Sequence, residues 1–217
     1  MINFTGQKNQ YIIIPQSVCG NKNIMTLEIV FSSDEKRSEA TYWYNPTIFG
    51  CANSGTGTGE LNIYIKSGYL CFWTGMNPTP DQWYENSGIY VSDRKIHRVA
   101  LILDGQYIHA MYNHDEVYRF SIGRASANVP WCLGNGFNIA TDSPSTDYNS
   151  YVQGCSFRLY RFAVYDKAID VKDLYNFKAS EAICCYGSKL TDDKLSVKDL
   201  SGNNNNVTLS PGVKIIL

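Results

Sequence analysis

This sequence has no large excess of positive or negative charge, no long apolar segment and no closely spaced metal ligands. Its 217 residues carry a formal net charge of −1, which supplies no basic surface for phosphates and argues against nucleic-acid binding. No run reaches the roughly 18 apolar residues that span a bilayer, and the first residues lack the basic and apolar regions of a secretory signal. We therefore expect neither nucleic-acid binding nor membrane insertion.

The cysteines are odd in number and include no Cys-x-x-Cys pair. We interpret them mainly as reduced, small core residues of a chain that folds in a reducing cytoplasm. One or two disulfides in a secreted protein are the alternative, and a zinc site is the least favoured reading because paired ligands are missing. The seven cysteines are Cys19, Cys51, Cys71, Cys132, Cys155, Cys184 and Cys185.

What the chain has instead is short or alternating apolar runs, separated by clusters of Gly, Asn, Pro and Ser. This pattern is typical of β-strands joined by turns. Lys66-Ser67-Gly68, Asp104-Gly105 and the stretch 113–116 each join two runs closely enough to predict hairpins and antiparallel pairing. The expected strands cover residues 10–15, 24–32, 46–52, 60–68, 69–75, 88–92, 97–105, 106–113, 117–123, 136–141 and 155–166.

Only residues 170–178 argue for a helix. Asp170 is a suitable N-cap, and Val171, Leu174 and Phe177 recur at three-residue spacing. The run 97–105 is apolar on both faces and should be a central strand. Many short strands, close hairpins and no repeat of about 40 residues predict an all-β, two-sheet antiparallel sandwich with one short helix.

Three stretches carry a family resemblance. "INFTGQKNQYIIIP" looks like an opening strand, "KIHRVALILDGQYIHAMYN" is similar to a His-x-Val-Ala strand with its hairpin, and "CSFRLYRFAVYDKAIDVKDLYNF" matches a closing strand and short helix. Over residues 1–180 the chain resembles the concanavalin A-like lectin and glucanase superfamily, specifically its laminin-G-like jelly rolls. The resemblance implies a jelly-roll sandwich in which Ile169 inserts under the sheets.

The stretch "KDLSGNNNNVTL" resembles a segment that precedes the opening strand in many laminin-G-like modules, although here it follows the closing helix. Asn and Gly tolerate positive φ, so we expect a tight loop between two strands, with no need for a ligand. We favour a circular permutation in which residues 181–217 return strands to the sandwich of residues 1–180. Otherwise the segment begins a second module or docks on a partner subunit.

Catalytic motifs are weak. Glucanases of the superfamily carry Glu-x-Asp-x-x-Glu on one strand, which projects carboxylates into a cleft, whereas the corresponding strand here has Glu28 alone. "GTGTGE" at 55–60 lacks the Lys and helix of a phosphate loop and is interpreted as a hairpin loop. His97, His109 and His114 are expected to be structural. We therefore predict that the chain is not an enzyme.

The loops are rich in aromatic and amide side chains. Aromatic rings can stack on sugar faces while Asn and Asp hydrogen-bond hydroxyls, although the same rings could also pin loops onto the sandwich. Calcium is conceivable at the rim but has no specific motif, so no cofactor is expected. The candidate glycan-binding residues are Trp43, Tyr44, Asn53, Trp83, Tyr84, Asp142, Asp147 and Tyr148.

Together these features predict a non-catalytic, lectin-like recognition domain. The resemblance extends to laminin-G-like modules of phage and prophage structural proteins, which implies a virion-associated fibre, tail or capsid-decorating protein. Its partners would be host surface polysaccharide and other virion subunits, and a homo-oligomer is expected. The alternatives are a purely architectural virion subunit and a secreted or cell-surface bacterial carbohydrate-binding module, with a glycoside hydrolase last.

Overall fold

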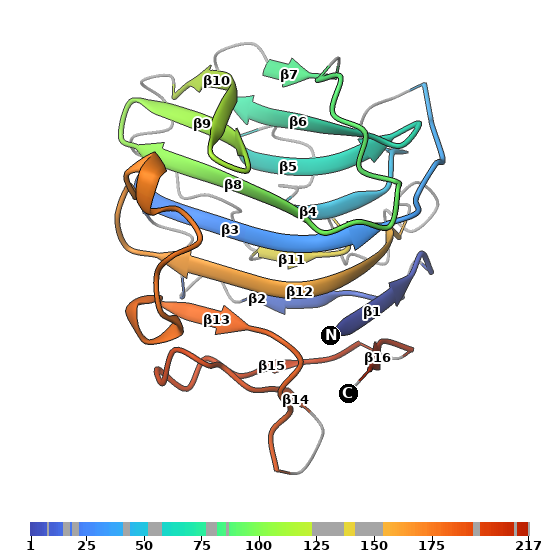
Figure 1. Cartoon of the computed structure of the whole chain (residues 1–217), viewed down its shortest axis with the longest axis vertical. Coiled ribbons are helices and arrows are strands. Elements are labelled where there is room, and N and C mark those ends of the chain that lie inside the picture. The colour runs from blue at the N-terminus through green and yellow to red at the C-terminus, as the bar shows by residue number, and fades with distance from the viewer. Residues whose placement is uncertain are drawn as a thin grey trace.

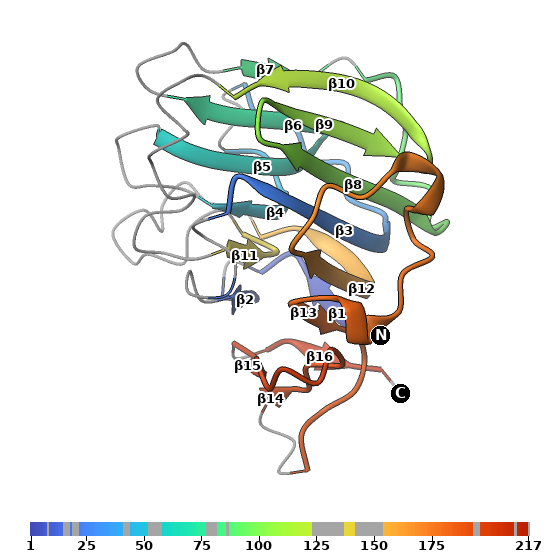
Figure 2. The same ribbon diagram turned by 90° about the vertical axis from the view of Figure 1, so that its left-hand side faces the viewer.

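Two antiparallel β-sheets pack face to face in the computed structural model of this chain (Figures 1 and 2). It describes residues 1–7, 9–14, 18, 22–40, 44–51, 58–76, 82–85, 87–122, 137–141, 154–192, 196–210 and 212–216. The predicted all-β sandwich is confirmed. No helix among these residues is long and apolar enough to cross a membrane.

The larger sheet has eight strands. Its last strand, β13, pairs with the end of β12 that β1 leaves uncovered. The strands, in spatial order, are β10 (Asp115–Ser121), β9 (Tyr107–Tyr112), β8 (His97–Asp104), β3 (Ile24–Ser33), β12 (Ser156–Tyr165), β1 (Ile2–Thr5) and β16 (Lys214–Ile215), with β13 (Cys184–Tyr186) beside β12.

The smaller sheet has six strands and lies behind the larger one in Figure 1. All its neighbouring strands are antiparallel. In spatial order they are β2 (Ile12–Ile14), β11 (Phe137–Ile139), β4 (Thr47–Cys51), β5 (Thr58–Lys66), β6 (Tyr69–Met76) and β7 (Gln82–Tyr84).

The core lies between the two sheets. Leu27, Ile29 and Phe31 of β3 face Ile63 of β5 and Phe72 of β6 within one continuous apolar cluster, and all five are almost fully buried. Complete burial of one such side chain favours folding by about 1.5–3 kcal/mol. Because successive side chains of a strand point to opposite faces, the residues between them are left for the outer faces of the sheets.

The predicted hairpins and the central strand are confirmed. Residues 66–69, 104–107 and 112–115 join β5 to β6, β8 to β9 and β9 to β10, and β8 lies between β3 and β9. Two expectations were wrong. Residues 88–92 form only an isolated bridge between Tyr90 and Tyr69, and Gln82–Tyr84, expected in a loop, pairs with β6 as the edge strand β7.

A second apolar layer covers the outer face of the larger sheet. Figure 2 shows the chain after β12 crossing this face beside β8. Ile169 and Leu174 of this crossing are buried against Ala100 and Ile102, the outward residues of β8. Ile169 thus inserts beneath the crossing segment on the outside of the sandwich, which explains why β8 is apolar on both faces.

The predicted helix near 170–178 is shorter than expected. The chain forms single 3-10 turns, η4 (Val171–Asp173) and η5 (Ala179–Glu181), although Asp170 caps the first one through a 3.1 Å bond from the Lys172 N–H. Tyr175 then has a φ of +66°, which a right-handed helix cannot contain. Its N–H donates instead to the buried Glu28 carboxylate at 2.8 Å, so a tertiary contact replaces the helical one.

The asparagine run is a structural turn, as predicted. It connects β14 (Ser196–Val197) to β15 (Val207–Thr208), which pair with each other. The Asp199 carboxylate accepts N–H bonds of 2.9–3.0 Å from Cys185, Ser201 and Asn205. The side chains of Asn203 and Asn205 donate to the Ile183 carbonyl. The run therefore binds the chain's own backbone beside β13.

The last residues lie beside the first strand. β16 pairs with β1 through Ile215 opposite Ile2, and Gln10 donates to the Gly212 carbonyl at 2.6 Å. Both views show the two chain ends close together (Figures 1 and 2). This proximity is what a circular permutation requires; the permutation itself and the division at residue 180 stay predictions.

Candidate functional site

One row of register positions crosses the smaller sheet. Asn138 of β11 lies opposite Gly50 of β4, which lies opposite Asn62 of β5. Asn62 is opposite Trp73 of β6, and Trp73 is opposite Trp83 of β7. Directly opposite residues of paired strands share one face of a sheet. Five strands therefore bring two amides, a glycine and two tryptophan positions into a line.

This row belongs to the outer face. Leu61, Ile63 and Phe72, the sequence neighbours of Asn62 and Trp73, all lie in the core between the sheets. Alternation along each strand therefore turns Asn62 and Trp73 away from that core. Consistent with this, Trp73 belongs to a separate small apolar cluster with two other outward residues, one on each of β5 and β6.

The side-chain carbonyl oxygen of Asn62 lacks a hydrogen-bond donor. Asn62 and Trp73 are only 7% and 5% exposed, so both side chains are buried although they lie on the outer face of the sheet. The Asn62 Oδ1 atom is buried and accepts no hydrogen bond in the structure. An unsatisfied buried polar atom of this kind costs about 1–3 kcal/mol, which is a reason to look for an external donor.

Charges beside the row compensate one another. Glu85 accepts a 3.0 Å hydrogen bond from the Tyr64 hydroxyl and forms a 2.8 Å ion pair with Lys66. Tyr64 lies two residues after Asn62 on the same strand, and so on the same face. The pair fixes the Tyr64 ring and leaves no net charge from Lys66 and Glu85 together. The face is thus suited to neutral polar groups.

The thiol on this face is inert. Cys71 is fully buried, and desolvation, with a smaller contribution from the negative charge of Glu85, raises its pKa to about 12. A neutral thiol is neither a nucleophile nor a metal ligand at physiological pH. Cys71 therefore acts as a packing residue beside Trp73.

The structure describes only some of the predicted glycan-binding residues. Tyr84 stacks on Tyr118 of β10, with ring centroids 4.6 Å apart, and so links the edges of the two sheets. Tyr44 is half-buried and lies three residues before the start of β4 at Thr47. Trp83 occupies the row described above, although its side chain is outside the described part. The candidates outside the described residues are Trp43, Asn53, Asp142, Asp147 and Tyr148.

Sequence reasoning missed Asn62, Trp73 and Asn138. Attention to loops passed over polar residues inside strands, although "LNIYIK" already shows Asn62 alternating with core residues. The available signal was a polar Asn at the outward position between the two apolar residues Leu61 and Ile63. The alignment of Asn62 with Trp73 and Asn138 could not be read locally, because it depends on pairing between separate strands.

The carboxylate considered for catalysis faces elsewhere. Glu28 of β3 is completely buried on the outer side of the larger sheet, where it accepts bonds from the Tyr175 N–H and the Tyr165 hydroxyl. Burial raises the pKa of Glu28, while the Tyr175 N–H and nearby Arg161 act in the opposite direction. Glu28 anchors the crossing segment, and it is not on the face that carries Asn62.

The histidines make contacts that explain their positions. His97 lies between the Tyr112 hydroxyl at 2.9 Å and Asp93 at 2.8 Å, and His109 lies between Asp104 and Glu116. His114 contacts a backbone carbonyl of the crossing segment. Within the described ranges, no group of three His, Cys, Asp or Glu side chains could hold a metal ion.

Comparison with known proteins identifies relatives by structure alone. No family model and no curated protein sequence matches the chain. A presumptive carbohydrate-binding protein from Bacteroides ovatus aligns over 98% of this chain and 58% of its own length, with a TM-score of 0.69 and 17% identity. The chain thus spans little more than half of that protein.

Two further structures share the fold. The mouse laminin α1 domains LG4-5 align over 76% of this chain and 42% of their own, with a TM-score of 0.55 and 11% identity. The CBM40 module of a Ruminococcus gnavus sialidase, solved with α2,3-sialyllactose, aligns over 78% of this chain and 94% of its own, with a TM-score of 0.53 and 12% identity. The chain therefore has the predicted concanavalin A-like, laminin-G-like jelly-roll fold.

Proposed function

We propose that this concanavalin A-like jelly roll is a non-catalytic carbohydrate-recognition domain that binds glycan on the outer face of its six-stranded sheet. The row of Asn138, Gly50, Asn62, Trp73 and Trp83 carries the proposal. The similarity to carbohydrate-binding proteins, one of them solved with a bound oligosaccharide, supports it. Fold similarity alone would not suffice, because jelly rolls have many functions.

The chemistry of the row matches a sugar. Indole rings stack on the apolar faces of sugar rings, and amides exchange directional hydrogen bonds with hydroxyls. Gly50 places no side chain between Asn138 and Asn62, so a ring could approach the backbone there. A sugar hydroxyl that donates to Asn62 Oδ1 would satisfy the buried acceptor. The balanced pair of Lys66 and Glu85 favours a neutral unit at this position.

The decisive variant is Asn62→Leu. It has similar volume and removes the unsatisfied acceptor, so we expect unfolding free energy to stay the same or rise by up to about 1 kcal/mol. Glycan binding should nevertheless fall by about tenfold or more, because a buried hydrogen bond to the ligand is lost. Glycan-array signal and calorimetric titration with the best ligand would measure binding, and urea denaturation would measure stability.

Asn176→Leu is the matched control, since Asn176 is exposed on the segment that covers the other sheet. It should leave glycan binding unchanged. A Trp73→Phe variant should retain more binding than Trp73→Ala, because it keeps an aromatic face. Silence of the wild-type chain on a broad array, or full binding by Asn62→Leu, would refute the proposed site.

We also propose a virion setting, as a fibre, tail or capsid-decorating protein that contacts host surface polysaccharide and other virion subunits as a homo-oligomer. The support is the resemblance of "RLYRFAVYDKAI" and "VKDLSGNNNNVTL" to modules of phage structural proteins. Adjacent capsid, portal or tail genes and co-purification with virions would be expected. A gene neighbourhood of polysaccharide-degrading enzymes would instead favour a bacterial carbohydrate-binding module.

A further inference from the structure

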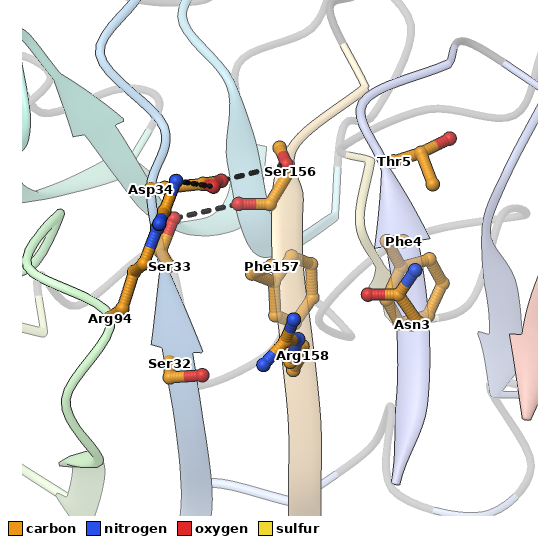
Figure 3. Close-up of a pocket in the computed structure, with 10 residues that line it drawn as sticks. All are labelled: Asn3, Phe4, Thr5, Ser32, Ser33, Asp34, Arg94, Ser156, Phe157 and Arg158. Carbon is orange, nitrogen blue, oxygen red and sulfur yellow. Dashed lines mark hydrogen bonds and ion pairs between the residues drawn. The ribbon is translucent and has the colours of Figure 1, made fainter. Parts of the chain in front are cut away.

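A polar pocket of about 480 Å³ lies on the outer face of the larger sheet, on the opposite side of the molecule from the row of Asn62 and Trp73 (Figure 3). Strands β1, β3 and β12 supply its floor, and the chain before β8 supplies Arg94. The volume lies within the range of about 300–1,000 Å³ typical of small-molecule sites. Neither the fold comparison nor the proposed glycan face accounts for it.

Two register rows line the floor. Asn3 of β1 lies opposite Arg158 of β12, which lies opposite Ser32 of β3. Two residues along the strands, Thr5 lies opposite Ser156. Figure 3 shows Asn3, Arg158 and Ser32 projecting from three adjacent strands, while Phe157 lies behind them. The residues that line the floor thus include one amide, three hydroxyls and a guanidinium.

The charges of the pocket do not cancel. Arg94 pairs with Asp34 through Nη2 and Oδ2 at 3.3 Å. Arg158 forms no ion pair with any described residue. Asp34 also accepts a 3.1 Å hydrogen bond from the Ser156 hydroxyl. The adjoining hollow adds one Lys and one Asp, Lys36 and Asp93, which balance each other. The pocket therefore keeps one excess positive charge.

Arg94 is held in an uncommon backbone conformation. Its φ of +64° is in the left-handed region, which non-glycine residues adopt rarely and at a cost. The Arg94 N–H donates to the Ser33 carbonyl at 2.9 Å, which ties the turn to the end of β3. Glycine would adopt this φ without strain. What the arginine adds at this position is therefore its guanidinium group.

The buried carboxylate of Glu35 holds Ser156, one of the residues that line the pocket, in place. Glu35 is 4% exposed and accepts bonds from the Ser156 N–H at 3.0 Å and the Arg37 Nε at 2.8 Å. Burial alone would raise the pKa of Glu35, but the hydrogen bonds from Arg37 and Ser156 outweigh it and hold this pKa below its usual value. Ser33 donates to the Ser156 carbonyl at 2.7 Å. The pocket is thus preorganised.

We propose that this pocket binds a monosaccharide unit that carries one carboxylate, such as a uronic acid. Guanidinium groups bind carboxylates bidentately. Arg158 lies in the middle of the floor and Arg94 at its side (Figure 3), next to hydroxyl and amide groups that can bond to sugar hydroxyls. One excess positive charge matches a monoanion better than a phosphate, which carries about −1.5 to −2 at pH 7. The site is independent of the neutral-sugar face on the other sheet.

The test is an NMR titration of the ¹⁵N-labelled chain with D-galacturonate. Shifts should concentrate at the amides of Asn3, Ser32 and Arg158, and they should weaken as salt is raised. Arg158→Gln and Arg94→Gly should each lower the affinity by about tenfold or more. Because glycine adopts positive φ without strain, Arg94→Gly keeps the turn, and its thermal stability should not decrease.

The controls separate the possible outcomes. Arg119→Gln, on edge strand β10 at the far side of the same sheet, should bind galacturonate as the wild type does. Galactose should bind at least tenfold more weakly than galacturonate. Equal binding of acetate would show a carboxylate site without sugar recognition, and stronger binding of galactose 6-phosphate would show a phosphate site. Either result, or no shift at the pocket, would overturn the proposal.

Discussion

Glu35 and Asn62 are both buried polar side chains, but only Glu35 has its hydrogen-bonding capacity satisfied. Glu35 accepts hydrogen bonds from Arg37 and from the Ser156 N–H, whereas Oδ1 of Asn62 accepts none. A satisfied buried group stabilises the fold, while an unsatisfied one costs free energy. We therefore expect Glu35 to stabilise the fold and propose Asn62 as a ligand-binding residue, two roles that substitution can separate.

Replacing Glu35 with Gln should destabilise the fold at neutral pH. The folded-state pKa of Glu35 lies below its usual value, so the ionised group stabilises the fold above the unfolded-state pKa, and this contribution disappears as the pH falls through the folded-state pKa. We expect a loss of about 2 kcal/mol at pH 7 that shrinks toward pH 3. Urea unfolding at both pH values measures it.

Asp115→Asn, in the exposed β9–β10 turn, is the control and should cost less than about 0.5 kcal/mol at either pH. A loss for Glu35→Gln that does not depend on pH would mean that shape, and not charge, explains the role of Glu35.

Among the secondary-structure elements, the sequence correctly predicted those that depend on interactions between neighbouring residues. The two-residue turn at Ser67 and Gly68 has positive φ at both positions, +54° and +87°, as Gly and small polar residues allow. The segment near Tyr175 was mispredicted as a longer helix because a distant partner, Glu28, binds its N–H. Strand β7 was missed because its pairing to β6 outweighs the turn-forming residues around it.

Gly68 offers a test of turn chemistry. A Cβ there would lie 2.5 Å from Cε2 of Tyr90, in addition to the unfavourable φ. We expect Gly68→Ala to lower the unfolding free energy by about 2–3 kcal/mol. Gly88→Ala, with a φ of +69° but open space around it, should lower it by only about 1 kcal/mol.

The Tyr90→Ala background isolates the steric part. There, Gly68→Ala should cost about as much as Gly88→Ala, because only the backbone conformation remains unfavourable. Chemical denaturation of the four variants completes the cycle. Equal costs of Gly68→Ala with and without Tyr90 would show that the ring moves aside freely.

At the scale of the whole molecule, the two outer faces of the sandwich differ. The segment after β12 covers part of the larger sheet, and the polar pocket lies on that sheet's uncovered end. The smaller sheet carries the row of Asn62 and Trp73. The C-terminal residues close the edge of the larger sheet at β1, so they contribute to the same domain stability as the first strand.

Ending the chain at Gly212 should test that contribution. Val213 and Ile215 pack against the main core, and their loss also removes the backbone pairing with β1. We expect the unfolding free energy to fall by about 2–4 kcal/mol, with one cooperative transition in thermal unfolding. Ile216→Ala, at a side chain 42% exposed, is the control and should cost under about 1 kcal/mol. An unchanged stability after truncation would mean that residues 213–217 do not belong to this sandwich.

The strand content, the antiparallel hairpins, the central strand β8 and the asparagine turn could be predicted from the amino-acid sequence, because alternation and turn residues act over a few neighbouring positions. Which outward polar residues meet depends on the tertiary structure. Four different strands supply Asn138, Gly50, Asn62 and Trp73. Three strands supply Asn3, Ser32 and Arg158. Register between strands far apart in the chain is fixed by packing of the whole core, and no local pattern encodes it.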